Sequence, residues 1–263
     1  MFLDLKNDEG ISKFIMIYGK REPLTVDYLV RSRIVKEGDT VLDIGANIGY
    51  YALLESKMAG KTGVVYAVEP IKNNMDLLKK NIELNGAGNI KTYNLAIGDA
   101  DRKRIEIYKR SKGNLSSLTA LSSDYGEVVS IEEVPMSTVD SFVKNEMNHP
   151  PNFIRMDVEG YEANILKGMK KALFTTPNLQ IEFHPTILST EQKDKIYDLL
   201  RDNQYSKVVI TINPKPRLGR LVRWLNKKMG ETYHENGELL EGNLELLHNM
   251  LFSCPRIFNA FLS

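Results

Sequence analysis

Several features of large protein classes are absent from this sequence. Only one cysteine, Cys254, occurs among 263 residues, so neither an internal disulfide nor a cysteine-based zinc site can form. No apolar run approaches the ~20 residues that a membrane-spanning helix needs. Four charged residues interrupt any apolar core of a signal peptide near the start: Asp4, Lys6, Asp8 and Glu9. These absences predict a protein of the reducing cytoplasm.

An excess of charge of either sign is also absent. Lys and Arg together number 35, and Asp and Glu together number 34, which leaves a net charge of +1 at pH 7. This balance provides no general attraction to nucleic acid, so no nucleic-acid partner is expected. The apolar content of 42% is enough for a full core, and 263 residues suffice for one large α/β domain with insertions. Composition does not indicate an oligomeric state.

Short, β-branched apolar stretches alternate with helical patterns along most of the chain. Strands are expected at 40–45, 63–70, 90–99, 152–157, 178–185 and 206–212. Helices are expected at 48–59, 72–86, 137–147, 161–169 and 190–203. This alternation predicts a doubly wound α/β fold, in which a mostly parallel sheet is flanked by helices.

Three segments depart from the alternation. Residues 1–37 form an N-terminal extension, with a short strand expected at 13–18 and a helix at 25–35. Residues 100–136 are expected to be an inserted hairpin region, which is a favourable place for substrate contacts. The third segment, 213–245, is expected to be a basic helical insertion.

The clearest part of this insertion is 215–230, KPRLGRLVRWLNKKMG, which carries six bases and no acid. Leu221 and Leu225 fall on one face at helical spacing. A basic amphipathic helix can lie on an anionic membrane, which would make the protein peripheral to the membrane. It can also pack its apolar face on the domain as a lid, with a solvated basic face. We expect the packed helix and retain the membrane contact as the alternative.

The stretch VLDIGANIGYY, 41–51, indicates a ligand-binding turn. A strand that enters a glycine-rich turn and opens a helix is typical of nucleotide-like ligands. A dinucleotide site requires G-x-G-x-x-G, but Asn47 and Tyr50 occupy the places of the second and third glycines. S-adenosylmethionine has no pyrophosphate, so its site needs fewer glycines. Gly45, Asn47 and Gly49 are therefore expected to border this cofactor.

Three acids are expected to contact the same cofactor. Asp43, late in the strand, can hold the cofactor's ammonium group directly or through water. Glu69 ends the second strand and can accept hydrogen bonds from both ribose hydroxyls, although a nicotinamide dinucleotide would use the same acid. Asp99 follows the third strand and can lie near the adenine or serve only in a turn.

The ends of the fourth and fifth strands are expected to carry the catalytic residues. Ligands of an open α/β sheet bind at the carboxyl ends of its strands, and Asp157 ends the fourth strand. Gln180, Glu182 and His184 are two residues apart, so they share one face of the fifth strand. We expect Asp157, Glu182 and His184 to be catalytic, with His184 as a base. The same three residues can form a divalent-metal site, but no metal is predicted.

Taken together, these motifs resemble the FkbM family of S-adenosylmethionine-dependent methyltransferases. The resemblance runs in order from about 38 to 185, and more loosely over 10–37. It is carried by VLDIGANIGYYALL, VVYAVEP, LLKKNIELN, NLAIGD, STVDSF, IRMDVEGYEANILKGM and LQIEFHP. It implies a Rossmann-like class I methyltransferase domain over 38–263. The implied sheet has seven strands, the seventh antiparallel, and 246–253 is the candidate for that strand.

The resemblance also implies O-methylation, so the expected acceptor is a hydroxyl of a glycan, glycolipid or related small molecule. The sequence DVEG at 157–160 supports oxygen, because amine-methylating enzymes of nucleic acids often carry an Asn/Asp-Pro-Pro-aromatic motif there. Three alternatives remain: an RNA methyltransferase of the same fold, a nicotinamide-dependent oxidoreductase, and a non-enzymatic adenosyl-binding protein.

Overall fold

The computed structural model describes residues 1–5, 11–110, 116–117, 128–175, 177–213 and 237–263. Its main sheet comprises β1 (Thr40–Ile44), β2 (Val64–Val68), β3 (Ile90–Tyr93), β8 (Phe153–Met156), β9 (Asn178–Phe183), β10 (Val208–Ile212), β11 (Glu238–Gly242) and β12 (Phe258–Leu262). The order across this eight-stranded sheet is β11-β10-β12-β9-β8-β1-β2-β3. Adjacent strands from β3 to β9 pair in parallel, which confirms the predicted α/β architecture.

The antiparallel strand exists, but its predicted position was wrong. Residues 246–253 belong to a helix, α10 (Leu244–Ser253), because Leu244, Leu247 and Leu251 recur at helical spacing and are buried. The antiparallel strand is β12, which lies between β9 and β10 and pairs antiparallel with both. A further strand, β11, pairs with the outer edge of β10, so the main sheet has eight strands instead of seven.

The helices of the α/β alternation lie close to their expected positions. They are α3 (Tyr50–Ala59), α4 (Lys72–Asn85), α5 (Val139–Glu146), α6 (Glu162–Lys167), α7 (Lys170–Phe174) and α8 (Thr190–Asp202). Gly86 ends α4 with a left-handed φ of 61°. The Thr138 hydroxyl accepts a hydrogen bond from the backbone N–H of Ser141 and so caps α5.

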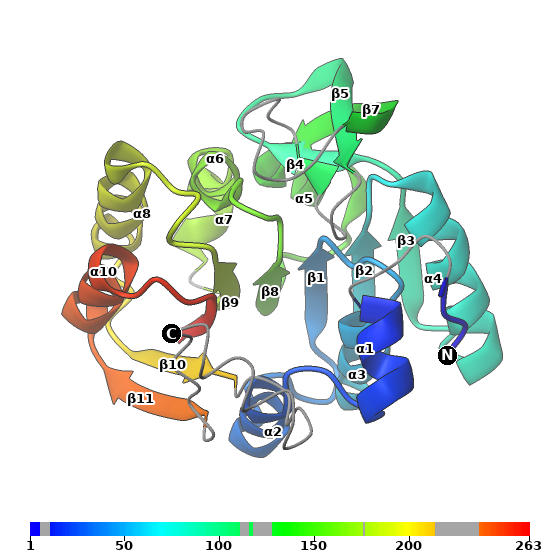
Figure 1. Cartoon of the computed structure of the whole chain (residues 1–263), viewed down its shortest axis with the longest axis horizontal. Coiled ribbons are helices and arrows are strands. Elements are labelled where there is room, and N and C mark those ends of the chain that lie inside the picture. The colour runs from blue at the N-terminus through cyan, green and yellow to red at the C-terminus, as the bar shows by residue number, and fades with distance from the viewer. Residues whose placement is uncertain (6–10, 111–115, 118–127, 176, 214–236) are drawn as a thin grey trace, which may run out of the picture.

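Successive residues of β1 face two separate cores, because side chains alternate across a strand. Val41 packs in one cluster with residues of α3 and α4, including Ala52 and Leu78. Leu42 packs in the other with residues of α5, α8 and α10. Helices therefore cover both faces of the sheet (Figure 1).

The N-terminal extension differs from the prediction in its first element. Residues 13–18, expected as a strand, lie in a helix, α1 (Ile11–Tyr18). A short apolar run does not by itself separate a helix from a strand. The next helix, α2 (Pro23–Ser32), agrees with the predicted helix at 25–35 and begins at a proline, whose fixed φ suits a first helical turn.

The hairpin insertion forms a second sheet. The predicted third strand, 90–99, divides into β3 and β4 (Ala96–Gly98), and β4 leaves the main sheet. It pairs with β7 (Val128–Thr138), which pairs with β5 (Arg102–Arg110); β6 (Ser116–Ser117) completes the order β4-β7-β5-β6. Figure 1 places β4, β5 and β7 above the carboxyl ends of β1 and β2. The insertion therefore lies beside the expected ligand site.

The basic stretch 215–230 falls outside the described residues, so its expected helix and its membrane contact remain predictions. No helix in the described ranges combines the length and the apolar character that crossing a bilayer requires.

Close contact between α6 and β4 makes Gly168 a sensitive position. A Cβ at Gly168 would lie 2.1 Å from the carbonyl oxygen of Gly98, whereas a Cβ at Gly88 meets nothing within 4 Å. We expect Gly168→Ala to lower the free energy of unfolding by about 1–3 kcal/mol through overpacking. Gly88→Ala should be neutral or stabilising by up to about 1 kcal/mol. Urea denaturation measures both, and equal midpoints for the two variants would contradict this packing.

Candidate active site

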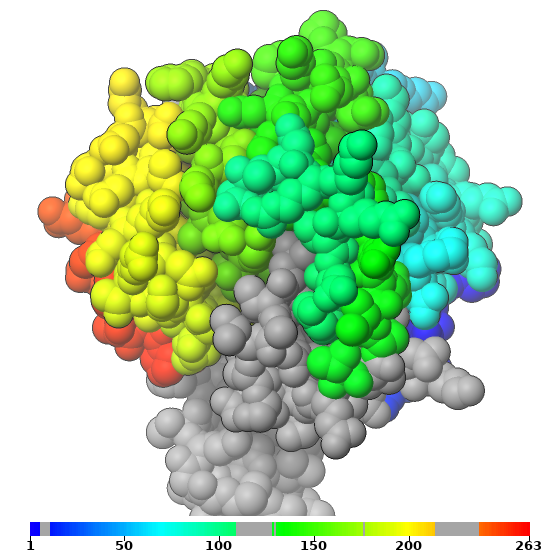
Figure 2. All heavy atoms as spheres, turned by 90° about the horizontal axis from the view of Figure 1, so that it is seen from above, coloured from blue at the N-terminus to red at the C-terminus, as the bar shows by residue number. Residues whose placement is uncertain are grey.

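A cavity of about 690 Å³ opens at the carboxyl ends of the parallel strands. Its wall includes Gly45 after β1, Glu69 after β2, Asp157 after β8 and Glu182 on β9. This is the position at which open α/β sheets bind ligands. Figure 2, which views the molecule from above, shows β5 and β7 lying across this end between α8 and α4. Ile107 of β5 contributes to the cavity wall.

Gly45 brings the ends of β1 and β8 together. Its φ is 82°, and an added Cβ would lie only 2.0 Å from the carbonyl oxygen of Asp157. Asn47 adopts a left-handed φ of 50° in the same turn and lines the cavity. Gly49 has another role: its Cβ would lie 2.5 Å from Leu78 Cδ1, so this glycine lets the start of α3 pack on α4.

Glu69 joins the turns that follow β1 and β2. Its Oε2 accepts a hydrogen bond from the backbone N–H of Asn47, and its Oε1 accepts one from that of Ile71, both at 2.9 Å. The Asn74 side chain donates to the same Oε1 at 3.3 Å. Burial raises the pKa of Glu69 to about 7. The carboxyl group is thus fixed in orientation while it borders the cavity.

Besides Gly49, two further predicted cofactor contacts lie away from the cavity wall. Asp43 is fully buried, and its Oδ1 accepts a hydrogen bond from Arg155 Nη1 at 3.0 Å. Asp99 pairs with Arg102 at 3.1 Å and with Lys167 at 3.3 Å. The chain has already entered the second sheet at Asp99, so that residue follows β4 and not the end of β3.

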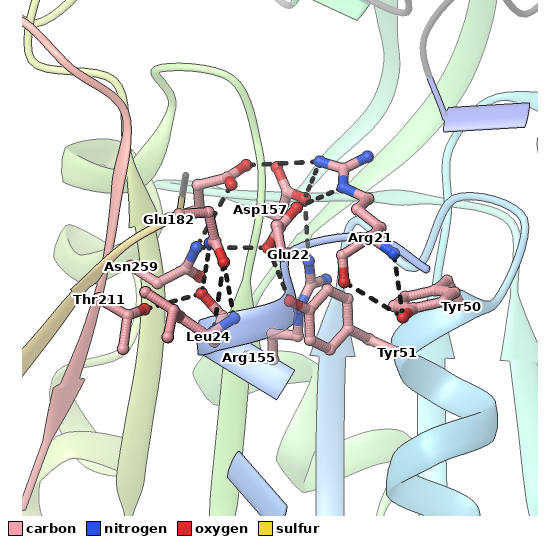
Figure 3. A network of polar contacts seen from close by, with 12 residues as sticks. Arg21, Glu22, Leu24, Tyr50, Tyr51, Arg155, Asp157, Glu182, Thr211 and Asn259 are labelled. Atoms are coloured by element: carbon pink, nitrogen blue, oxygen red, sulfur yellow. Dashed lines mark hydrogen bonds and ion pairs between the residues drawn. The ribbon is translucent and has the colours of Figure 1, made fainter. Parts of the chain in front are cut away.

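A buried arginine holds the end of β8 (Figure 3). Arg155 donates to Asp157 Oδ2 at 2.9 Å as well as to Asp43, and its guanidinium lies 3.9 Å from the centre of the Tyr51 ring. Arg21 Nη2 lies 3.7 Å from the same Asp157 oxygen. Burial raises the pKa of Asp157, but the two arginines outweigh burial and lower this pKa to about 2. Asp157 is therefore ionised at neutral pH.

Glu182 differs from Asp157 in the direction of its pKa shift. Burial first, and then the charge of Asp157, raise the pKa of Glu182 well above its usual range. A hydrogen bond from Glu182 helps to lower the pKa of Asp157. The side-chain amide of Asn259 in β12 donates to Glu182 Oε1 at 3.4 Å.

His184 follows β9 and is only 4% exposed. Its Nε2 lies 3.0 Å from Glu159 Oε2, and its Nδ1 lies 3.9 Å from Glu162 Oε1. Burial lowers the pKa of His184, but these carboxyl groups outweigh burial and raise this pKa to about 12. This pKa favours the protonated imidazole at neutral pH, and the role of His184 as a base remains a prediction. Among the described residues, no cluster of three or more His, Cys, Asp or Glu is arranged to hold a metal ion.

Sequence reasoning missed the residues that the N-terminal extension contributes. Arg21 and Glu22, between α1 and α2, line the cavity. Glu22 Oε2 accepts a hydrogen bond from the Tyr51 hydroxyl at 2.6 Å. No motif marks these two residues. Arg155 was also missed, although it precedes Asp157 by two positions on one strand face, a spacing that could have indicated a paired arginine.

The fold and the cavity together define a class of protein. The parallel sheet contains one antiparallel strand between β9 and β10, a glycine turn follows β1, and an acid follows β2. These features define a Rossmann-like, S-adenosylmethionine-dependent methyltransferase of class I. Residues 43–207 match the family model of the methyltransferase FkbM domain. That match covers more than half of the chain, so the chain belongs to the FkbM methyltransferase family.

Curated relatives agree with this class. The chain is 28% identical over 185 residues to the hexuronic acid methyltransferase AglP of Haloferax volcanii, covering 68% of this chain and 68% of that protein. It is 34% identical over 71 residues to a protein-L-isoaspartate O-methyltransferase of Methanocella arvoryzae, covering 27% of this chain and 38% of the relative.

Solved structures are similar at lower sequence identity. The FkbM methyltransferase of Methylobacillus flagellatus is 21% identical with a TM-score of 0.46, and the match covers 64% of this chain and 39% of that one. The precorrin-6y C5,15-methyltransferase of Geobacter metallireducens is 9% identical with a TM-score of 0.49, over 100% of this chain and 93% of that one.

The charge on His184 generates a prediction. Its folded-state pKa, about 12, exceeds the ordinary value of about 6.5. Its stabilising effect is then complete below about pH 6.5 and is lost as the pH rises toward the folded-state value. We expect the stability advantage of the wild type over His184→Gln to shrink steadily from about pH 6 to about pH 10. Denaturant unfolding at a series of pH values measures this difference.

An independent measurement uses the imidazole itself. Its NMR resonances should remain those of the protonated ring at neutral and mildly alkaline pH, and His184→Gln identifies them by their loss. A ring that titrates near its ordinary value would contradict the assigned charge.

Proposed function

We propose that this methyltransferase transfers the methyl group to a hydroxyl oxygen, and that its acceptor is a glycan, a glycolipid or a related small molecule. The observation that carries the proposal is the chemistry of one half of the cavity. Around the ends of β8, β9, β10 and β12 its wall offers carboxyl and amide groups: Asp157, Glu159, Glu182, Asn213 and Asn259. Such groups suit a molecule with several hydroxyl groups.

The other half of the cavity suits S-adenosylmethionine. Gly45, Asn47 and Glu69 would hold the cofactor, because the two turns bring backbone and a fixed carboxyl group to the cavity wall. Five acids and two bases line the described part of the cavity, an environment that favours a ligand with cationic groups. When bound, this cofactor supplies an electrophilic methyl group on its sulfonium.

The carboxyl pair at the ends of β8 and β9 is proposed to receive the acceptor. Asp157 is ionised and can accept a hydrogen bond from the acceptor hydroxyl. The raised pKa of Glu182 favours its protonated form, which is proposed to hold Asp157 in place. Asp157 is a weak base. That suffices here, because the hydroxyl proton becomes strongly acidic once the oxygen forms its new bond to carbon. His184 is proposed to neutralise Glu159 and is given no proton-transfer role.

The relative that acts on hexuronic acid supports a sugar-like acceptor. Membership of a methyltransferase family argues against the oxidoreductase alternative, as does Asn47 within the glycine turn. RNA remains the second candidate for the methyl acceptor. The balanced net charge of +1 gives this alternative no support.

The cofactor assignment predicts a selective loss of binding. Glu69→Ala should weaken S-adenosylhomocysteine binding by about 1.5–3 kcal/mol, because hydrogen bonds between a charged group and the ribose are lost. Glu83→Ala on the exposed surface of α4 is the matched control and should bind as the wild type does. Isothermal titration calorimetry measures both variants. Unchanged affinity in Glu69→Ala would remove this residue from the proposed site.

The acceptor assignment predicts different effects for the two carboxyl groups. At saturating S-adenosylmethionine, Asp157→Asn should lower kcat by about 10²–10⁴-fold, because the ionised hydrogen-bond acceptor is lost. Glu182→Gln should cost much less, since the amide resembles the protonated carboxyl group that it replaces. The assay follows radiolabelled methyl transfer to a panel of neutral and uronic-acid-containing oligosaccharides.

Alkaline treatment of the product identifies the methylated oxygen. A methyl ether on a hydroxyl survives, whereas a methyl ester on a carboxyl group is hydrolysed. Label that is lost in alkali, or transfer to RNA but to none of the oligosaccharides, would contradict the proposed function.

A further inference from the structure

Arg21 is held firmly although it belongs to the segment between two helices. Its backbone N–H donates to the Tyr50 hydroxyl, and its backbone carbonyl accepts from the same hydroxyl, both at 3.2 Å. The next residue, Glu22, has a left-handed φ of 48° and is tied to α3 through the Tyr51 hydroxyl. These contacts fix the backbone of Arg21 against the start of α3 independently of its side chain (Figure 3).

The Arg21 side chain has donors that its neighbours do not satisfy. Its Nε donates to Glu22 Oε1. Its Nη2 lies 3.7 Å from Asp157 and 3.9 Å from Glu182, which is ion-pair distance but too far for a hydrogen bond. Within the described residues, neither terminal nitrogen of Arg21 therefore has a hydrogen-bond acceptor. The side chain is 21% exposed and lines the cavity, so these donors are available to a ligand.

The position of Arg21 indicates which part of a ligand it meets. It lines a small recess of the same site together with Gly45, Asn47 and Tyr50, which belong to or follow the glycine turn after β1. Glu69, the proposed ribose contact, lies after β2. The end of the cofactor opposite the adenine, its amino-acid tail, would therefore lie on the Arg21 side.

The charges around Arg21 fit a zwitterion. The carboxylates of Glu22 and Asp157 already balance Arg21, so a ligand group with a net negative charge would find no uncompensated cation. A group that carries both a carboxylate and an ammonium satisfies the free donors of Arg21 and also faces Glu22, which lines the main cavity. An α-amino acid moiety has this composition.

We infer that Arg21 binds the carboxylate of the cofactor's amino-acid tail, with the adjoining ammonium facing Glu22. The planar guanidinium offers two parallel N–H donors to a carboxylate, a geometry that lysine lacks. The inference deepens the proposed cofactor site and adds to it a residue from outside the matched domain, 43–207. The N-terminal extension is then part of the cofactor site and not only a scaffold.

The test compares two ligands that differ only in the tail. S-adenosylhomocysteine carries the amino-acid moiety, and 5′-methylthioadenosine lacks it. We expect Arg21→Gln to weaken binding of S-adenosylhomocysteine by about 10- to 100-fold, the range for a lost charged hydrogen bond, and to leave the affinity for 5′-methylthioadenosine unchanged. Arg21→Lys should fall between Arg21→Gln and the wild type. Calorimetry measures all affinities.

Arg31→Gln is the matched control, since Arg31 lies on α2 with its side chain 79% exposed and pairs only with Asp27 among the described residues. It should bind both ligands as the wild type does. Equal weakening of both ligands by Arg21→Gln, with a lowered melting temperature, would show a structural role and overturn the inference; so would unchanged binding of both. A wild type that binds S-adenosylhomocysteine but methylates no oligosaccharide refutes the proposed acceptor and leaves the inference on Arg21 standing.

Discussion

The site depends on one buried ion pair network. Arg155, only 3% exposed, joins Asp43 at the end of β1 to Asp157 after β8 and packs its guanidinium on Tyr51 of α3. Burying three charged groups is costly, and the described contacts leave Asp43 Oδ2 and Arg155 Nε without hydrogen-bond partners. Such a network contributes little net stability, but removing one member would leave an uncompensated buried charge. The network fixes the position of Asp157 and keeps its carboxyl group ionised.

A second constraint acts on the same two strand ends. Gly45 has no side chain, so the turn after β1 can approach the backbone carbonyl of Asp157. Arg155 fixes the side chain of Asp157, and Gly45 leaves room for the backbone carbonyl of Asp157. Together they place an ionised carboxylate beside the turn that Asn47 and Glu69 complete through their hydrogen bond. The ends of β1 and β8 would therefore hold the proposed cofactor and acceptor sites next to each other.

Sequence patterns predicted the features that are determined by residues close together in the chain. The glycine turn, the acid after β2 and the end of the helix predicted at 72–86 all follow from residues close in sequence. Pairs between distant residues could not be predicted in this way. Asp43 pairs with Arg155, which lies 112 residues away in the sequence. Residues 246–253 were assigned to a strand, although the spacing of the leucines already favoured the helix that forms.

His184 shows why the chemistry of a residue is harder to predict than its location. Its place after the fifth strand follows from the alternation along 178–185, but its charge is set by Glu159 and Glu162, whose approach depends on the left-handed turn at Glu159 and Gly160. The same holds for Arg21, which no motif marks and which lines the cavity from the segment between α1 and α2.

The acids around the cavity connect these observations. Burial raises the pKa of Glu69 and of Glu182, so the protein without ligands holds buried carboxyl groups that water would solvate better. The arginines of the site already pair with acids, so a ligand with a sulfonium and an ammonium would bring additional positive charge. Its ammonium would also form hydrogen bonds with carboxyl groups whose ionised form is destabilised by burial. The same burial would favour a cationic cofactor in the proposed site, and Arg21 is proposed to bind the one anionic group that this cofactor carries.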